Sequence, residues 1–167
     1  MKLSHSEDFY LRILFGKIKV REIMITPPIV IPEQESLSHV YSLFKQHGIG
    51  HLIVINEKME LAGVISQKYF YRAQSPKRVV GNKMLTSDTI LDGDSYFNKE
   101  SLDNLYLNNI TNKQPLTLGP DDPIAKAVLK MSTQNVAFVP VVDVYNKVVG
   151  SISLKEIVDF SAHILKE

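Results

Sequence analysis

The sequence predicts an α/β fold, α+β in some classifications, built from two copies of one β-α-β-β-α unit. An ungapped internal repeat is the first observation: residues 20–70 align with 107–157 at a constant offset of 87 positions, as Gly63 and Gly150 illustrate. Each copy also alternates short β-branched runs, typical of strands, with apolar residues at helical spacing. Finally, a chain of 167 residues is long enough to bury roughly 70% of its unfolded surface.

Composition narrows the functional classes. The chain has 19 basic and 18 acidic side chains and a formal net charge of +1, without the single-sign excess that favours nucleic-acid or membrane-surface partners. It contains no cysteine, which excludes disulfides and thiolate metal sites. No apolar run approaches the roughly 18 residues of a membrane span. Because the amino terminus is polar and lacks a secretory h-region, a cytoplasmic protein is expected.

The first helix is predicted over residues 4–18, because Ser4 and Glu7 have the spacing of a capping box. In the first copy, the β-branched run 29–31 predicts a short strand. A helix is expected to follow from Leu37 and to stop at Gly48, where glycine favours helix termination.

The rest of the first copy reads as a strand, a turn, a strand and a helix. Residues 52–55 form a buried apolar run, 56–58 predict a turn, and 61–66 predict a second strand. The final helix is expected from about Gln67.

The second copy carries the same signals. Asp122 is predicted as the N-cap of a helix with Pro123 at its first position. Residues 136–142 and 148–152 are predicted as paired strands. The first of these is apolar throughout its centre, which indicates burial on both faces, and Pro140 is expected near a strand edge or a bulge.

These elements divide the chain into a lead-in helix (1–19), a first repeat (20–71), an insert (72–106) and a second repeat (107–167). An insert of this length is expected to be structured or functional. Its Asp92-Gly93 pair is a hairpin-turn signal. A calcium loop is not supported there, because Phe97 stands where the loop requires glycine.

Four features together resemble tandem CBS domains, the cystathionine β-synthase domain family. They are the Val-Arg-Glu-Ile-Met stretch 20–24, Pro28, the stretch 136–143 ending Val-Pro-Val-Val-Asp, and the two Gly-h-h-Ser motifs, where h is apolar or small. The resemblance covers about two-thirds of the chain. It implies two repeats packed about a pseudo-twofold axis with two clefts between them, binding of adenosine nucleotides or S-adenosyl ligands, regulation of another protein, and a homodimer.

The family's ligand signature is Gly-h-h-Ser/Thr-x-x-Asp, in which the resemblance assigns the hydroxyl to phosphate or ribose contacts and the carboxylate to both ribose hydroxyls. A carboxylate suits that task because it only accepts hydrogen bonds and can take two donors. The second copy keeps Ser153 and has Glu156 at the acidic position, whereas the first keeps Ser66 and has Tyr69 there. The first ribose clamp is therefore expected to be absent.

Family members that bind phosphates usually carry Arg or His just before the buried second strand, and only His51 matches that position here. The resemblance implies that His51 and Glu156 share one cleft, whereas Tyr69 faces Ala137 and Phe138 in the other. At most one adenosine-type site is therefore predicted, for AMP, ATP or S-adenosylmethionine, with ligand contacts from Ser153, Glu156, His51 and Ser66.

Each of these residues also has a purely structural interpretation. A serine at a strand-to-helix junction is an ordinary N-cap, and a carboxylate in the first helical turn is stabilised by the helix dipole. A histidine beside a buried strand is commonly hydrogen-bonded within the fold.

Two functions therefore remain open. One is a regulatory module with one live ligand site that alters a partner or its own dimer, and the other is a ligand-free scaffold that docks a partner. An enzyme has no support, because no catalytic constellation is recognisable, and the histidines lack the spacing of a metal site.

Overall fold

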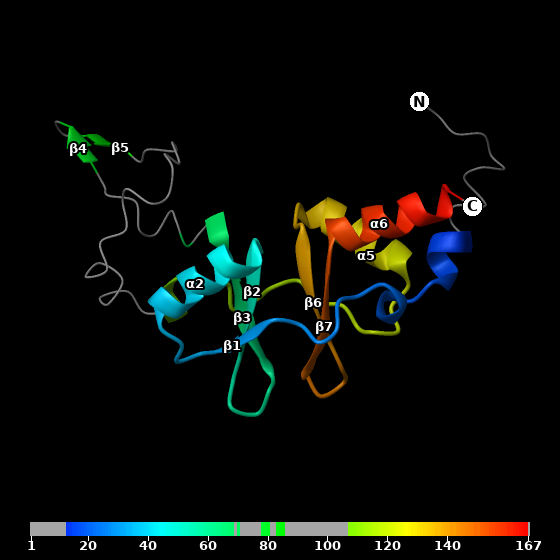
Figure 1. Ribbon diagram of the computed structural model, residues 1–167, viewed down its shortest axis with the longest axis horizontal. Helices are drawn as coiled ribbons and strands as arrows, with labels where there is room; N and C mark the ends of the chain where they lie inside the picture. The colour runs from blue at the N-terminus through cyan, green and yellow to red at the C-terminus, as the bar shows by residue number, and fades with distance from the viewer. Residues whose placement is uncertain (1–12, 69, 71–77, 81–82, 86–106, 167) are drawn as a thin grey trace. The chain divides into compact units, whose positions relative to one another are not determined.

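The computed structural model describes residues 13–68, 70, 78–80, 83–85 and 107–166 (Figure 1). The chain divides into two compact units. We call them the repeat-1 unit (30–54 and 62–113) and the repeat-2 unit (1–29, 55–61 and 114–167), after the sheet that each contains. Within the described residues, no helix has the length and hydropathy needed to cross a membrane.

The repeat-1 unit is built on a three-stranded sheet of order β1-β2-β3. Its elements are β1 (Val30–Pro32), α2 (Leu37–His47), β2 (His51–Ile55), β3 (Leu61–Ser66), the short antiparallel strands β4 (Arg78–Val80) and β5 (Lys83–Leu85), and the 3-10 turn η2 (Leu107–Asn109). One face of the sheet contributes Leu52, Val54 and Ile65 to a core with Val40 and Phe44 of α2. The alternating side chains of a strand explain why these residues share one face.

The repeat-2 unit has a similar organisation, but its sheet contains two strands, β6 and β7. Where repeat 1 has β1, Leu118 makes a single parallel bridge to Val141, so the predicted first strand of the second copy is reduced to this bridge. Its elements are η1 (Val20–Glu22), α5 (Ile124–Gln134), β6 (Phe138–Val142), β7 (Val148–Ser153) and α6 (Leu154–Ile164). Strands β6 and β7 pair antiparallel. Val139 and Ile152 pack with Met131 of α5 and Ile157 of α6 in the second core, so helices cover that face of the strands.

Several predicted boundaries are confirmed. Helix α2 ends at Gly48 in the left-handed region (φ 59°), as predicted. Helix α5, for which no end was predicted, ends at the equivalent Asn135 (φ 51°). The pairing of β6 with β7 shifts register between Val141 and Val142, next to Pro140, as expected for a proline beside a bulge.

One boundary prediction is wrong by a residue. Pro123 is the N-cap of α5, with an extended backbone, and the helix begins at Ile124. The Asp122 carboxylate instead accepts from the Gly119 backbone N–H (2.9 Å) and from Nζ of Lys126 (2.6 Å). Of the predicted lead-in helix, residues 13–17 are helical and 4–12 lie outside the described residues, as does the Asp92-Gly93 turn.

The segment that begins each repeat pairs with the sheet of the other repeat. Ile25, near the start of repeat 1, exchanges two backbone hydrogen bonds with Ser151 of β7 (2.8 and 3.1 Å). Asn112, near the start of repeat 2, exchanges two with Val64 of β3 (3.0 and 2.9 Å). Since the two pairs differ by the same 87 positions, the internal repeat extends to long-range pairing.

This backbone pairing between repeats explains why each Gly-h-h-Ser motif begins with glycine. A Cβ on Gly63 would lie 2.6 Å from the carbonyl oxygen of Asn112 and would also overlap the Thr111 side chain. A Cβ on Gly150 would lie 2.6 Å from Sδ of Met24 and 3.0 Å from the Ile25 carbonyl oxygen. Both glycines are therefore required for the close approach of the segments that contain Asn112 and Ile25, whether or not a ligand binds.

We predict that Gly63→Ala and Gly150→Ala each lower the free energy of unfolding by about 1–3 kcal/mol, because the added methyl overlaps the crossing segment. Gly63→Ala should be the more severe, since a backbone oxygen yields less than the Met24 side chain. Urea denaturation followed by circular dichroism measures the change.

Gly50→Ala is the matched control, because its Cβ would meet nothing within 4 Å. It should change stability by no more than about 0.5 kcal/mol. Equal effects of all three substitutions would show that close approach is not what selects glycine in the two motifs.

Candidate functional site

The structure places the four predicted ligand residues in two pairs. Ser153 and Glu156 lie together where β7 enters α6, in the repeat-2 unit. His51 begins β2 and Ser66 ends β3, both in the repeat-1 unit. The combination of Glu156 with His51 in one cleft therefore stays a prediction.

Ser153 and Glu156 form a capping box at the start of α6. The Ser153 backbone N–H and hydroxyl both donate to Oε2 of Glu156, each at 2.6 Å. The Ser153 hydroxyl also accepts from the Lys155 backbone N–H (3.1 Å). Because a helix start leaves backbone N–H groups without partners inside the helix, both side chains have a structural task without a ligand.

One oxygen of the Glu156 carboxylate takes no part in the capping box. The side chain is half-buried, and Oε1 accepts no hydrogen bond from any residue that the structure describes. A carboxylate oxygen can accept two hydrogen bonds, so Oε1 has the chemistry to hold a diol such as a ribose. The Ser153 hydroxyl has already used its single donor on Glu156.

His51 is half-buried at the start of β2. Burial lowers the pKa of its imidazole from the ordinary value, because a buried charge loses its hydration. The side chain is therefore mainly neutral at pH 7. A ligand phosphate beside it would favour the protonated ring and raise that pKa.

The junction between β3 and the following helix mirrors the one at Ser153. The Gln67 backbone N–H donates to the Gly50 carbonyl (2.8 Å), just as Leu154 donates to Ala137 (3.0 Å). Ser66 is half-buried there. Tyr69, predicted to replace the ribose clamp, lies outside the described residues.

The second predicted cleft was expected to be lined by Ala137 and Phe138 as well as Tyr69. Ala137 is exposed, and Phe138 is half-buried at the start of β6.

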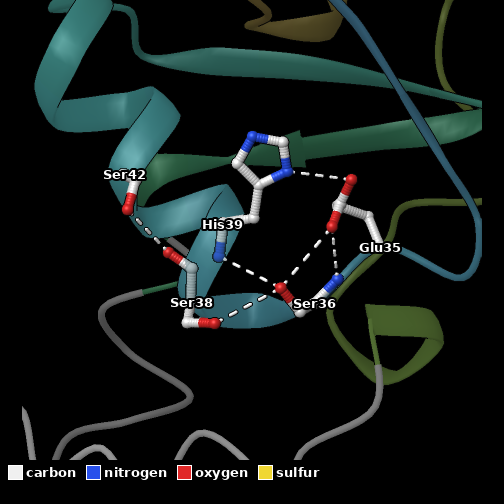
Figure 2. Close-up of polar contacts among 5 residues, drawn as sticks. All are labelled: Glu35, Ser36, Ser38, His39 and Ser42. Carbon is white, nitrogen blue, oxygen red and sulfur yellow. Dashed lines mark hydrogen bonds and ion pairs between the residues drawn. The ribbon is translucent and has the colours of Figure 1, made fainter.

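A second polar cluster lies at the start of α2 (Figure 2). Glu35 accepts from the Ser36 backbone N–H (2.8 Å) with one oxygen and from Nδ1 of His39 (2.9 Å) with the other. The Ser36 hydroxyl accepts from the His39 backbone N–H (3.2 Å) and lies 3.3 Å from the Ser38 hydroxyl. The histidine ring thus pairs with Glu35 and not with Ser36, so this cluster caps a helix and lacks the nucleophile–base pair of a hydrolase.

The second repeat has a carboxylate and a basic side chain at the equivalent positions. Asp122 and Lys126 stand 87 positions after Glu35 and His39, and their ion pair is 2.6 Å long. The pKa of Glu35 is lowered mainly by the hydrogen bond from His39 and then by that from Ser36. For Asp122, burial alone would raise the pKa, but hydrogen bonds from Lys126 and Gly119 outweigh it and lower the pKa.

Ser151 was not singled out by the sequence. It is the one buried polar side chain within the described ranges, with 5% of its surface exposed. The sequence does offer one signal: the second position of the motif, which is apolar in the first repeat (Val64), is polar in the second. Within the same ranges, no group of three or more His, Asp or Glu side chains is arranged to hold a metal ion.

Comparison with known proteins identifies both repeats. The model of the CBS domain matches residues 20–75 and again 107–163. The L-aspartate semialdehyde sulfurtransferase of Methanocaldococcus jannaschii is 25% identical over 138 residues, 83% of this chain. The homoserine O-acetyltransferase of Methanosalsum zhilinae is 27% identical over 142 residues, 85% of this chain.

The chain spans only 22% and 24% of the length of these two relatives. Among solved structures, it resembles the CBS domain pair of protein MJ0100 in complex with 5′-methylthioadenosine and S-adenosyl-L-methionine. The TM-score is 0.64 and the identity 25%, with 86% of this chain and 98% of that chain covered.

We predict that Glu35→Gln lowers the free energy of unfolding at pH 7 by about 0.5 kcal/mol, as for a surface pair. Because folding lowers the pKa of Glu35, its contribution is present above the unfolded value of 4.5 and is lost as pH falls through the folded value. The substitution should therefore flatten the stability curve below about pH 5.

Urea denaturation at a series of pH values measures this curve. Glu57→Gln is the control, because Glu57 is an exposed turn residue with no ion pair in the described chain. If the free energy of unfolding of Glu35→Gln fell as steeply with pH as that of the wild type, Glu35 would not be the source of this pH dependence.

The capping box yields a separate prediction. Ser153→Ala and Glu156→Ala should each lower the free energy of unfolding by about 1 kcal/mol, because backbone N–H groups at the start of α6 lose their acceptors. Glu156→Gln should cost less, since its amide oxygen can still accept from Ser153.

Lys155→Ala is the control in the same denaturation experiment. It removes only an exposed ion pair with Asp159, which solvent screens, so the substitution should change the free energy of unfolding little. If Glu156→Gln were as damaging as Glu156→Ala, the charge rather than the acceptor would be what α6 requires.

Proposed function

The chain belongs to the CBS domain family, and from this membership we propose that it is a regulatory module that binds one adenosine-containing ligand per chain. The candidates are AMP, ATP and S-adenosylmethionine. The observation that carries the proposal is the Glu156 carboxylate, which stands at the acidic position of the ligand motif and keeps one oxygen available. The resemblance to the MJ0100 domain pair, solved with two adenosyl ligands, supports the same ligand class.

Ligand binding would then alter a partner protein or the module's own dimer. Helix α6 has apolar side chains on its exposed side, with Leu154 49% and Val158 62% exposed one turn apart. Exposed apolar surface of this kind supports association, and we propose a homodimer through helix faces.

A ligand-free scaffold is the second candidate. It is favoured by the capping box, which gives Ser153 and Glu156 a structural reason to be present. Under this alternative, the serine of the first repeat would also serve only as a helix cap.

The test is calorimetric titration with AMP, ATP, S-adenosylmethionine and NAD. We expect one site per chain, and Glu156→Gln should weaken binding by tenfold or more. Its amide oxygen accepts from Ser153 as Oε2 does in the wild type, so the NH2 group, which only donates, replaces the acceptor Oε1 for the ribose hydroxyls. Lys155→Gln, at an exposed neighbouring position, should bind normally. Sedimentation of the same samples reports any change in the dimer.

The pH dependence tests His51. Burial lowers the pKa of His51 and a phosphate would raise it, so binding of AMP takes up a proton and should tighten as pH falls from about 8 to 6.5. 5′-Methylthioadenosine, which lacks phosphate, should show no such trend, and neither should AMP with His51→Gln. No heat and no thermal stabilisation with any ligand would favour the scaffold.

A further inference from the structure

The Ser151 hydroxyl is buried and has no hydrogen-bond partner among the described residues. Only 5% of the residue is exposed, and Oγ makes no hydrogen bond to any part of the chain that the structure describes. Burying a hydroxyl without a hydrogen bond destabilises a protein. Such groups are rare in native structures, and each one calls for an explanation, such as a functional role or an ordered water.

The fold itself does not require a hydroxyl at this position. Both backbone groups of Ser151 are already paired with Ile25, and the equivalent residue in repeat 1 is Val64, which is 8% exposed and makes the same backbone pairing with Asn112. A valine therefore satisfies every structural demand that the repeat makes here.

The hydroxyl lies on the strand face that carries the ligand motif. Ile152 packs into the helix-covered core, so Ser151 and Ser153 lie on the opposite face of β7. Ser151 is opposite Pro140 of β6, and Ser153 is opposite Phe138. This face therefore presents two hydroxyls from one strand, beside a proline ring and an aromatic ring.

We propose that the Ser151 hydroxyl hydrogen-bonds the nucleobase of the ligand whose ribose is held by Glu156. Two residues of a strand span about 6.6 Å, comparable with the separation between ribose hydroxyls and the far edge of a base. Ser151 is also more buried than Ser153, as expected for the inner end of a ligand. This inference rests on the proposed nucleotide site and adds a specificity-determining residue to it.

Ser151→Val and Ser151→Thr test the inference, because the two side chains have nearly the same shape and differ in the hydroxyl. We expect Ser151→Val to bind AMP about tenfold more weakly, the loss of one hydrogen bond, and Ser151→Thr to bind as wild type. Ribose 5-phosphate, which has no base, should bind both variants equally, as measured by NMR titration at millimolar concentration.

Stability of the ligand-free protein supplies a second readout. Ser151→Val should leave the urea midpoint unchanged or raise it, whereas Val64→Ser, the matched control, should lower it by burying a new hydroxyl. Since valine and threonine add nearly the same volume at this buried position, a lower midpoint for Ser151→Val than for Ser151→Thr would show that the hydroxyl already has a partner in the ligand-free protein, and would overturn the inference.

The outcomes separate the two proposals. If the wild-type protein binds no nucleotide, the proposed function fails and this inference fails with it. If the wild type binds AMP and Ser151→Val binds it equally well, only the role of Ser151 is overturned. An equal loss of AMP and ribose 5-phosphate would contradict the assignment to the base.

Discussion

The pairing of the first residues of each repeat with the sheet of the other repeat is the constraint on which the other features depend. Each repeat donates the residues before its first strand to the sheet of the other, through the pairs Ile25–Ser151 and Asn112–Val64. Since these backbone hydrogen bonds require close approach, glycine is needed at positions 63 and 150. The motif that resembles a ligand signature is therefore, at its first position, a packing requirement, and only its later positions are available for binding.

The structural and ligand-binding readings of Glu156 are compatible. One carboxylate oxygen caps α6 while the other makes no hydrogen bond in the described chain. The cap holds the side chain in one orientation before any ligand arrives. Less conformational entropy is then lost on binding, so a capping residue is well suited to be a binding residue as well.

The internal repeat made most elements predictable, because its periodicity repeats a strand, a helix and two strands at one offset. Helix ends were harder: the N-cap at Pro123, where Asp122 was expected, depends on which backbone bonds Asp122 makes with its neighbours. The exchanged pairing was not predicted, since nothing local in residues 20–25 marks a partner more than 100 positions away. Ser151 was missed for a related reason, because its significance lies in burial rather than in a motif.

The exchange also bears on how such a chain arises. A protein with only one repeat would have a sheet with an unpaired edge beside its motif glycine, and its initial segment would have no second sheet to pair with. Two such chains can satisfy both requirements if the initial segment of each pairs with the sheet of the other. The ancestral form is therefore expected to be a symmetric pair of separate subunits. Duplication within one gene then turns that subunit contact into an intramolecular one. It also frees the two halves to diverge, as Glu156 and Tyr69 have done at the seventh, acidic position of the motif.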